Sequence, residues 1–150
     1  MIKILFVCHG NICRSPMTEF VMKDLVAKAG LEHLISVSSC AATYEEIGND
    51  TYPPVRRLLK DKGIPFTKRE ARIFTPADYE ESTYVIGMDD ENRHDLYHLT
   101  KGDPQKKISL LLEWAGEKRS VADPWYTDDY ETAYRDIRKG CAAILERVMP

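Results

Sequence analysis

Several features that would place the chain in a specialised class of protein are missing from its 150 residues. No hydrophobic run approaches the roughly 20 residues that a membrane-spanning helix needs, so we expect no membrane span. The apolar segment at residues 2–7 is short and lacks a basic leader, so we expect a strand there and not a secretion signal. The net charge of −3 does not indicate a broad basic surface, and we expect no nucleic-acid partner.

Cysteine spacing also argues against a metal site. The four cysteines include no Cys-x-x-Cys pair, the usual spacing of structural zinc ligands, so we expect no metal. Two disulfides are arithmetically possible, but nothing else in the chain is typical of a secreted protein. We therefore expect reduced thiols and a cytoplasmic protein. The four cysteines are Cys8, Cys13, Cys40 and Cys141.

Short apolar runs alternate with helical periodicities along the whole chain, without an internal repeat, a low-complexity tract or a linker. This alternation predicts one α/β domain over residues 1–150 with a parallel sheet, because parallel strands need long crossover connections. We expect strands at residues 2–7, 34–39, 83–88 and 107–112. We expect helices at residues 16–29, 53–62, 75–81, 89–99 and 128–148.

The segment after the first expected strand has the composition of an anion-binding loop. Ligands bind outside the carboxyl ends of the strands in open sheets of this kind. Five residues separate Cys8 from Arg14, enough backbone to surround one small anion with inward-facing amides. Gly10 and Asn11 tolerate the positive φ that such a turn needs. The nucleotide-binding ending Gly-Lys-Ser/Thr is absent. The expected phosphate-binding residues are His9, Gly10, Asn11, Ile12, Cys13, Arg14 and Ser15, and Pro16 suits a first helical position.

Cys8 stands at the mouth of this loop, where it is a candidate nucleophile. The loop amides, Arg14 and the following helix N-terminus all favour the thiolate over the thiol. The planar fork of Arg14 can hold two phosphoryl oxygens, which a lysine cannot do. Ser15 can donate its hydroxyl to the Cys8 sulfur, and it can also be the helix N-cap, since the two roles do not exclude each other. Cys8 itself is alternatively a buried, inert cysteine. Cys13 is either a small loop filler or the partner of Cys8 in a reversible disulfide.

A candidate general acid lies far along the chain, in the sequence Ala122-Asp123-Pro124-Trp125-Tyr126. Proline disfavours the helical conformation for the residue before it, so Asp123 is expected to be extended. Trp125 and Tyr126 would give the site aromatic walls that help to exclude water. A plain Asp-Pro turn is the alternative. Because the chain also contains the Cys8 loop, which needs a proton donor for the leaving oxygen, we interpret Asp123 as a general acid.

These residues resemble the low-molecular-weight protein tyrosine phosphatases. The resemblance rests on residues 7–16 and on Asp123-Pro124-Trp125, with weaker similarity between them, and it covers nearly the whole chain. It implies a three-layer sandwich with a four-stranded parallel sheet flanked by helices, a phosphate-binding loop after the first strand, and no metal or organic cofactor. It also implies that phosphotyrosine-bearing proteins are the substrates, and that phosphate or other oxyanions bind as ligands or inhibitors.

The resemblance assigns roles residue by residue. It implies that Cys8 is the nucleophile, Arg14 the phosphate clamp and Asp123 the acid and then the base. Asn11 would hold the loop in shape, with support from Ser15 and Ser39. Two departures stand out. Arg69 occupies a place where the family often has a histidine, so we expect one brace of Asn11 to be altered, and Glu45 occupies a place where an aromatic usually lines the cleft. The expected substrate walls are Tyr44, Glu45, Trp125 and Tyr126.

Two rival functions share this loop. A thiol-dependent arsenate reductase would need further reactive cysteines near the third strand, and none lies between Cys40 and Cys141. A non-catalytic phosphate-binding module would lack Cys8, Arg14 or Asp123, and the chain has all three. The sequence therefore predicts a phosphotyrosine phosphatase that works through a cysteinyl-phosphate intermediate.

Overall fold

A four-stranded, all-parallel sheet forms the centre of the computed structural model, which describes residues 1–149. The strand order is β2-β1-β3-β4. The register sets Phe6 beside Ser39 of the neighbouring strand on one side and Ile86 on the other. The expected α/β sandwich with a four-stranded parallel sheet is confirmed. The strands are β1 (Ile2–Cys8), β2 (Ile35–Ala41), β3 (Tyr84–Gly87) and β4 (Ile108–Leu110).

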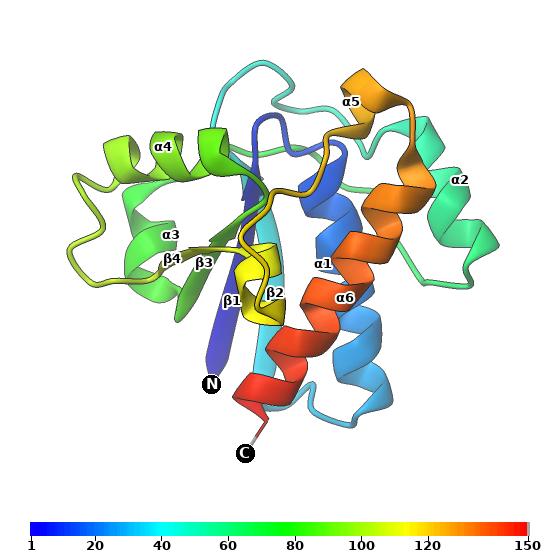
Figure 1. Ribbon diagram of the computed structural model, residues 1–150, viewed down its shortest axis with the longest axis horizontal. Helices are drawn as coiled ribbons and strands as arrows, with labels where there is room; N and C mark the ends of the chain where they lie inside the picture. The colour runs from blue at the N-terminus through cyan, green and yellow to red at the C-terminus, as the bar shows by residue number, and fades with distance from the viewer. Residues whose placement is uncertain (150) are drawn as a thin grey trace.

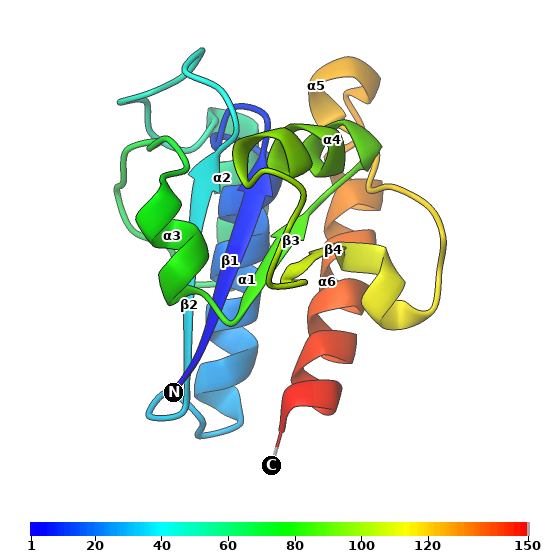
Figure 2. The same cartoon turned by 90° about the vertical axis from the view of Figure 1, so that its left-hand side faces the viewer.

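Helices cover both faces of the sheet. Helices α1 and α6 lie against one face, and α3 and α4 lie on the other (Figure 1). The strands end at the edge of the sheet where α5 sits, opposite the start of β1 and the end of α6, and a quarter turn shows the same arrangement (Figure 2). The helices are α1 (Arg14–Lys28), α2 (Pro53–Asp61), α3 (Pro76–Glu81), α4 (Asp90–Leu99), α5 (Pro124–Thr127) and α6 (Tyr130–Val148), with a 3₁₀ helix η1 (Leu111–Ala115).

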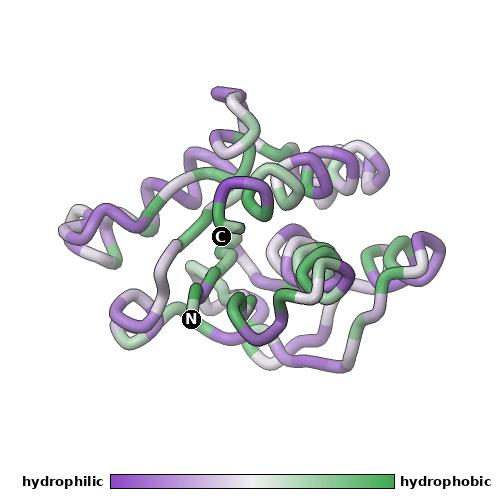
Figure 3. The backbone as a smooth tube through the Cα atoms, turned by 90° about the horizontal axis from the view of Figure 1, so that it is seen from below, coloured by the Kyte–Doolittle hydropathy of each residue, from purple (hydrophilic) through white to green (hydrophobic). Residues whose placement is uncertain are grey.

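Strand β1 is hydrophobic on both sides because both sides are buried. Ile4 and Phe6 face the main core beneath α1 and α6, whereas Leu5 and Val7 face a second cluster beneath α3 and α4. All four side chains are at most 1% exposed. A doubly covered parallel strand therefore shows a continuous apolar run instead of alternation. Hydrophobic segments run mainly through the middle of the molecule and hydrophilic ones around its outside (Figure 3). None of the helices within residues 1–149 combines the length and the apolar composition of a membrane span.

Most element boundaries lie one or two residues from the expected ones, and one short helix was not expected at all. Helix α1 begins at Arg14, so Pro16 is the third helical residue and Ser15 is not the N-cap; proline is tolerated there because first-turn amides lack intrahelical partners. Strand β4 ends at Leu110, because the rest of that apolar run turns into η1. The four-residue helix α5 follows Asp123, where the sequence showed only an extended Asp-Pro.

Candidate active site

The site lies where the carboxyl ends of β1 and β3 meet the start of α1. Residues 8–15 connect β1 directly to α1, so their backbone turns around the positive end of a 15-residue helix. The loop starts at Cys8, which is 4% exposed, and ends in Arg14 and Ser15, which are buried. The loop therefore holds its chemistry-bearing side chains between a buried strand and a buried helix start.

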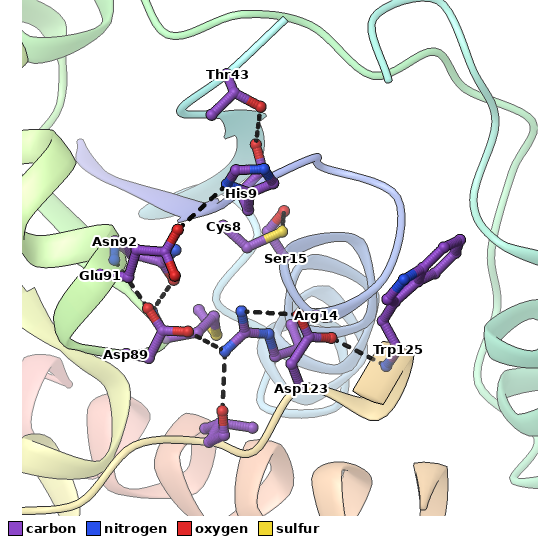
Figure 4. Close-up of polar contacts among 12 residues, drawn as sticks. Cys8, His9, Arg14, Ser15, Thr43, Asp89, Glu91, Asn92, Asp123 and Trp125 are labelled. Carbon is purple, nitrogen blue, oxygen red and sulfur yellow. Dashed lines mark hydrogen bonds and ion pairs between the residues drawn. The ribbon is translucent and has the colours of Figure 1, made fainter. Parts of the chain in front are cut away.

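The Cys8 sulfur is held by a buried hydroxyl. It lies 3.0 Å from the Ser15 Oγ. Asn11 donates its side-chain amide to the same Oγ at 2.8 Å, so the Ser15 proton is free to be donated to sulfur. Figure 4 shows Cys8 and Ser15 next to each other above the Arg14 guanidinium. The Ser15 hydroxyl can thus give one hydrogen bond to a Cys8 thiolate, and its orientation is fixed by the bond from Asn11.

Asn11 is the residue around which the loop turns. Its φ is 57°, in the left-handed region, and its side chain is fully buried. The amide donates to Ser39 Oγ at 2.9 Å, and Ser39 in turn donates to Glu19 at 2.6 Å. Arg69 donates to the Asn11 backbone carbonyl at 2.8 Å and also to its side-chain oxygen. The Arg69 guanidinium therefore braces Asn11 at the position where the phosphatase family that the sequence resembles often has a histidine.

Arg14 is 3% exposed and surrounded by acceptors. Its Nη1 donates to Asp89 at 2.7 Å and to the Val121 carbonyl at 2.9 Å, and its Nη2 lies 3.5 Å from Asp123. Burial alone would lower the pKa of Arg14, but Cys8, Asp89 and Asp123 together raise it above its ordinary value. The guanidinium therefore stays charged and keeps one orientation.

Asp123 reaches the site from the segment before α5. Its backbone is extended, as the following proline requires, with φ −81° and ψ 113°. One carboxylate oxygen accepts the Trp125 amide at 3.0 Å, which makes Asp123 the N-cap of α5, and the other faces Arg14. The carboxyl is a quarter exposed, so it can exchange protons with solvent.

These residues line one pocket of about 360 Å³. Trp125 and Tyr126 form an exposed aromatic side, and Glu45 stands on another. Glu46 also lines the pocket and was not predicted. Tyr44 does not line it and is 76% exposed, so the structure does not bring this expected wall residue to the site. The lining consists of Cys8, His9, Gly10, Ile12, Cys13, Arg14, Glu45, Glu46, Asp123, Trp125 and Tyr126.

Asn11, Ser15 and Ser39 are absent from that lining and support the loop from behind. Cys13 lines the pocket as a free thiol, and burial followed by the nearness of Cys8 raises its pKa. Cys13 is therefore protonated at neutral pH and is not the activated sulfur.

His9 forms the rim of the loop. Its Nε2 lies 2.8 Å from Glu45 and its Nδ1 lies 3.7 Å from Glu91. Within residues 1–149, His9, Glu91 and Asp95 are the group whose ligand atoms come within 4.8 Å of one another and could hold a metal ion. The chemistry described below makes no use of a metal there.

Two supporting residues have roles that the sequence did not predict. Asp89 follows β3 and both caps α4 and binds Arg14. Its position after a parallel strand was a usable signal, because such positions meet at one edge of the sheet. Arg69 was expected to alter one brace of Asn11, and nothing local in the sequence indicates that its own side chain forms that brace.

The chain matches the family model described as low molecular weight phosphotyrosine protein phosphatase over residues 3–149. It is 36% identical over 150 residues to the low molecular weight protein-tyrosine-phosphatase YfkJ of Bacillus subtilis, covering 99% of this chain and 96% of that protein. It is 36% identical over 151 residues to the human low molecular weight phosphotyrosine protein phosphatase, and the match covers 96% of this chain and 94% of that protein.

Solved structures of low molecular weight phosphatases share the fold of this chain. The crystal structure of YfkJ superposes with a TM-score of 0.95 over 99% of this chain and 94% of that one. The crystal structure of SP-PTP, a low molecular weight protein tyrosine phosphatase from Streptococcus pyogenes, superposes with a TM-score of 0.91 at 38% identity. The match covers 100% of this chain and 95% of that one.

Proposed function

This chain belongs to the low molecular weight phosphotyrosine protein phosphatase family, and from that premise we propose that it hydrolyses phosphotyrosine through a phosphate covalently bound to Cys8. One observation carries the proposal: Cys8, Arg14 and Asp123 line the same pocket although Asp123 is 109 residues from Arg14 along the chain. A nucleophile, an anion clamp and a proton donor are the three groups that cleavage of a phosphate monoester needs.

In the first step the Cys8 thiolate attacks phosphorus in line with the tyrosine oxygen. The S–P bond forms while the P–O bond breaks, and Asp123 gives its proton to the departing phenolate oxygen. Ser15 stabilises the sulfur anion before the attack. The products of this step are the free tyrosine hydroxyl and a cysteinyl phosphate.

In the second step a water molecule attacks the cysteinyl phosphate. The Asp123 carboxylate takes a proton from that water, and the S–P bond breaks to release inorganic phosphate and the thiolate. Arg14 faces the phosphoryl oxygens in both steps. Its Nη1 is occupied by Asp89 and Val121, so its remaining N–H groups are preorganised for the transferring group.

The aromatic side of the pocket supports an aryl substrate. Trp125 and Tyr126 are 54% and 85% exposed and border the pocket. The flat phenyl ring of a substrate can therefore pack against these aromatic side chains while its phosphate lies in the loop. We propose a phosphotyrosine-bearing protein as the physiological substrate. Four free cysteines are consistent with the reducing cytoplasm as its compartment.

The proposal is tested by hydrolysis of p-nitrophenyl phosphate. We expect Cys8→Ser to abolish turnover while it still binds phosphate, because the loop amides and Arg14 remain. Asp123→Ala should lower kcat roughly a hundredfold or more, with a smaller effect on phosphate binding. Asp61→Ala, which removes an exposed carboxylate at the end of α2, is the matched control and should keep native turnover.

Equal activity in all of these proteins would rule the mechanism out. The arsenate reductase alternative predicts arsenate turnover with a thiol reductant and weak aryl phosphatase activity. The phosphate-binding module predicts phosphate binding without turnover in the native chain. The native protein and the three variants, assayed with p-nitrophenyl phosphate, arsenate and phosphate, distinguish these outcomes.

A further inference from the structure

The segment that carries Asp123 has little local support. Helix α5 is a single turn of four residues, and Trp125, Tyr126 and Thr127 are exposed. One turn of helix is not stable by itself, because helix nucleation costs more than its few hydrogen bonds return. The position of the Asp123 carboxyl therefore depends on the tertiary contacts of this segment.

Besides the contact of Asp123 with Arg14 and the burial of Pro124, the segment makes an aromatic contact. The ring of Trp125 packs on the ring of Tyr52, with centroids 5.2 Å apart and planes inclined at 53°. Tyr52 in turn stacks on Tyr130, the first residue of α6, at 6.5 Å and 26°. Tyr130 is partly buried, and this burial raises its pKa to about 12. Tyr52 thus stands between the two helices on either side of the Asp128 turn.

Tyr52 is also bonded to the phosphate-binding loop. Its backbone N–H donates to the Ile12 carbonyl at 2.8 Å. Its ring is partly buried against the main core, and Pro53 after it restricts its backbone. One residue therefore contacts the loop that holds the nucleophile through its backbone and the segment that holds the acid through its ring.

We propose that Tyr52 is a positioning residue for proton transfer: its ring holds Trp125, and through the Trp125 amide it fixes the Asp123 carboxyl over the Cys8 loop. The proposal rests on the proposed function, since it concerns the proton that Asp123 gives to the leaving oxygen. The ring, and not the hydroxyl, performs this role, because the contact to Trp125 is between the two rings.

The leaving group distinguishes this role from a general structural one. A phenolate is a poor leaving group and needs a proton, whereas a 2,4-dinitrophenolate is stable enough to leave without one. A displaced acid therefore slows phenyl phosphate cleavage selectively. A damaged loop or a loosened fold slows both substrates alike. The value of kcat/KM reports the step in which the leaving group departs.

We expect Tyr52→Leu to lower kcat/KM for phenyl phosphate by roughly tenfold to a hundredfold, and for 2,4-dinitrophenyl phosphate by no more than about twofold. Tyr52→Phe keeps the ring and should retain native values for both substrates. Trp125→Leu removes the other ring of the Tyr52–Trp125 contact, the more exposed of the two, and should show the same selectivity for phenyl phosphate. Because the two residues act through one contact, the double variant should lose no more selectivity than either single variant.

Equal losses on the two substrates, additive losses in the double variant, or a Tyr52→Phe protein as impaired as Tyr52→Leu would each overturn the proposal. If Tyr52→Leu does not fold, the Trp125→Leu protein decides by the same ratio. Asp123→Ala provides the reference. If that variant also shows no leaving-group selectivity, the proposed function has failed; if only the Tyr52 and Trp125 variants lack it, the positioning role alone has failed.

Discussion

At the scale of single residues, the conformation of Asn11 is the most demanding feature of the site. A non-glycine residue at φ 57° is uncommon and persists only where its surroundings fix it. Arg69 contributes through one nitrogen, Nη2, which donates to both the backbone carbonyl and the side-chain oxygen of Asn11. The Arg72 amide adds a longer bond of 3.3 Å to the same side-chain oxygen. The loop geometry therefore depends on a residue that does not line the pocket.

Replacing Arg69 should impair the loop from behind. We expect Arg69→Ala to lower the free energy of unfolding by about 2 kcal/mol, because two buried Asn11 oxygens lose a charged donor. We also expect kcat for p-nitrophenyl phosphate to fall by roughly tenfold, since the loop that carries Cys8 and Arg14 loses part of what fixes its shape. Urea denaturation and steady-state kinetics measure the two effects.

Two further variants separate charge from geometry at this position. Arg69→Lys keeps the positive charge but lacks the second nitrogen, Nη1, whose bond to the Thr51 hydroxyl at 3.3 Å orients the guanidinium, so it should recover little of the lost activity. Lys68→Ala, on the exposed neighbouring residue, should be native-like in both assays. Full activity in Arg69→Lys would mean that a single charged nitrogen is enough and that the orienting bond to Thr51 is not required.

At the scale of elements, the packing of α6 on η1 leaves almost no free space. Gly140 lies on the buried side of α6, and a methyl group added there would stand 2.5 Å from the Cγ of Leu111. Leu111 is fully buried and cannot swing away. The close approach explains a glycine in the middle of a 19-residue helix, where it costs about 1 kcal/mol relative to alanine.

Gly140→Ala should therefore destabilise the protein although alanine is the better helix former. Overpacking costs about 1–3 kcal/mol and is partly offset by the roughly 1 kcal/mol gained in propensity, so we expect a net loss of about 1–2 kcal/mol. Ala142→Gly, on the exposed side of the same helix, isolates the propensity effect and should lose about 1 kcal/mol. A Gly140→Ala protein more stable than the native one in urea denaturation would contradict the close packing.

The elements also show how far the sequence predicts the fold. Helix α6 was predictable because its apolar stripe repeats over five turns, and β1 because a buried parallel strand is continuously apolar. Helix α5 was not, because its order comes from the contact of Trp125 with Tyr52, which no local pattern encodes. The apolar run at residues 108–112 fits a strand and a 3₁₀ helix equally well, and only packing against α6 separates them.

At the scale of the whole molecule, the parallel sheet is what makes the site predictable in part. Its strands end at one edge, so the loop after β1 and the cap of α4 after β3 must meet. The Cys8 loop was predictable because its anion-binding residues are contiguous. The link of Arg69 to Asn11 was not, since it crosses 58 residues and depends on how the segment before α3 wraps around the loop.

The buried thiols make the fold sensitive to alkali. Burial raises the pKa of Cys13, Cys40 and Cys141 well above the ordinary value of 9.0. These thiols stay protonated in the folded state but ionise in the unfolded chain above that value. A raised folded pKa means stability that is complete below pH 9.0 and is lost as the pH rises above it. We therefore expect the free energy of unfolding, measured in urea with a reductant, to change little up to about pH 8 and to fall with increasing slope as the pH rises past 9.0.

Cys141 allows the contribution of one thiol to be measured. It is fully buried in α6, and its sulfur lies 3.8 Å from the Thr18 carbonyl as a protonated donor. Cys141→Ala removes one titrating group, so above pH 9.0 its stability should fall less steeply than that of the native chain, by about 1.4 kcal/mol per pH unit at most. Ile144→Val creates a similar small cavity one turn away without changing any titration, and it should keep the native slope. Parallel slopes in all three proteins would show that the Cys141 thiol ionises as easily in the folded protein as in the unfolded chain.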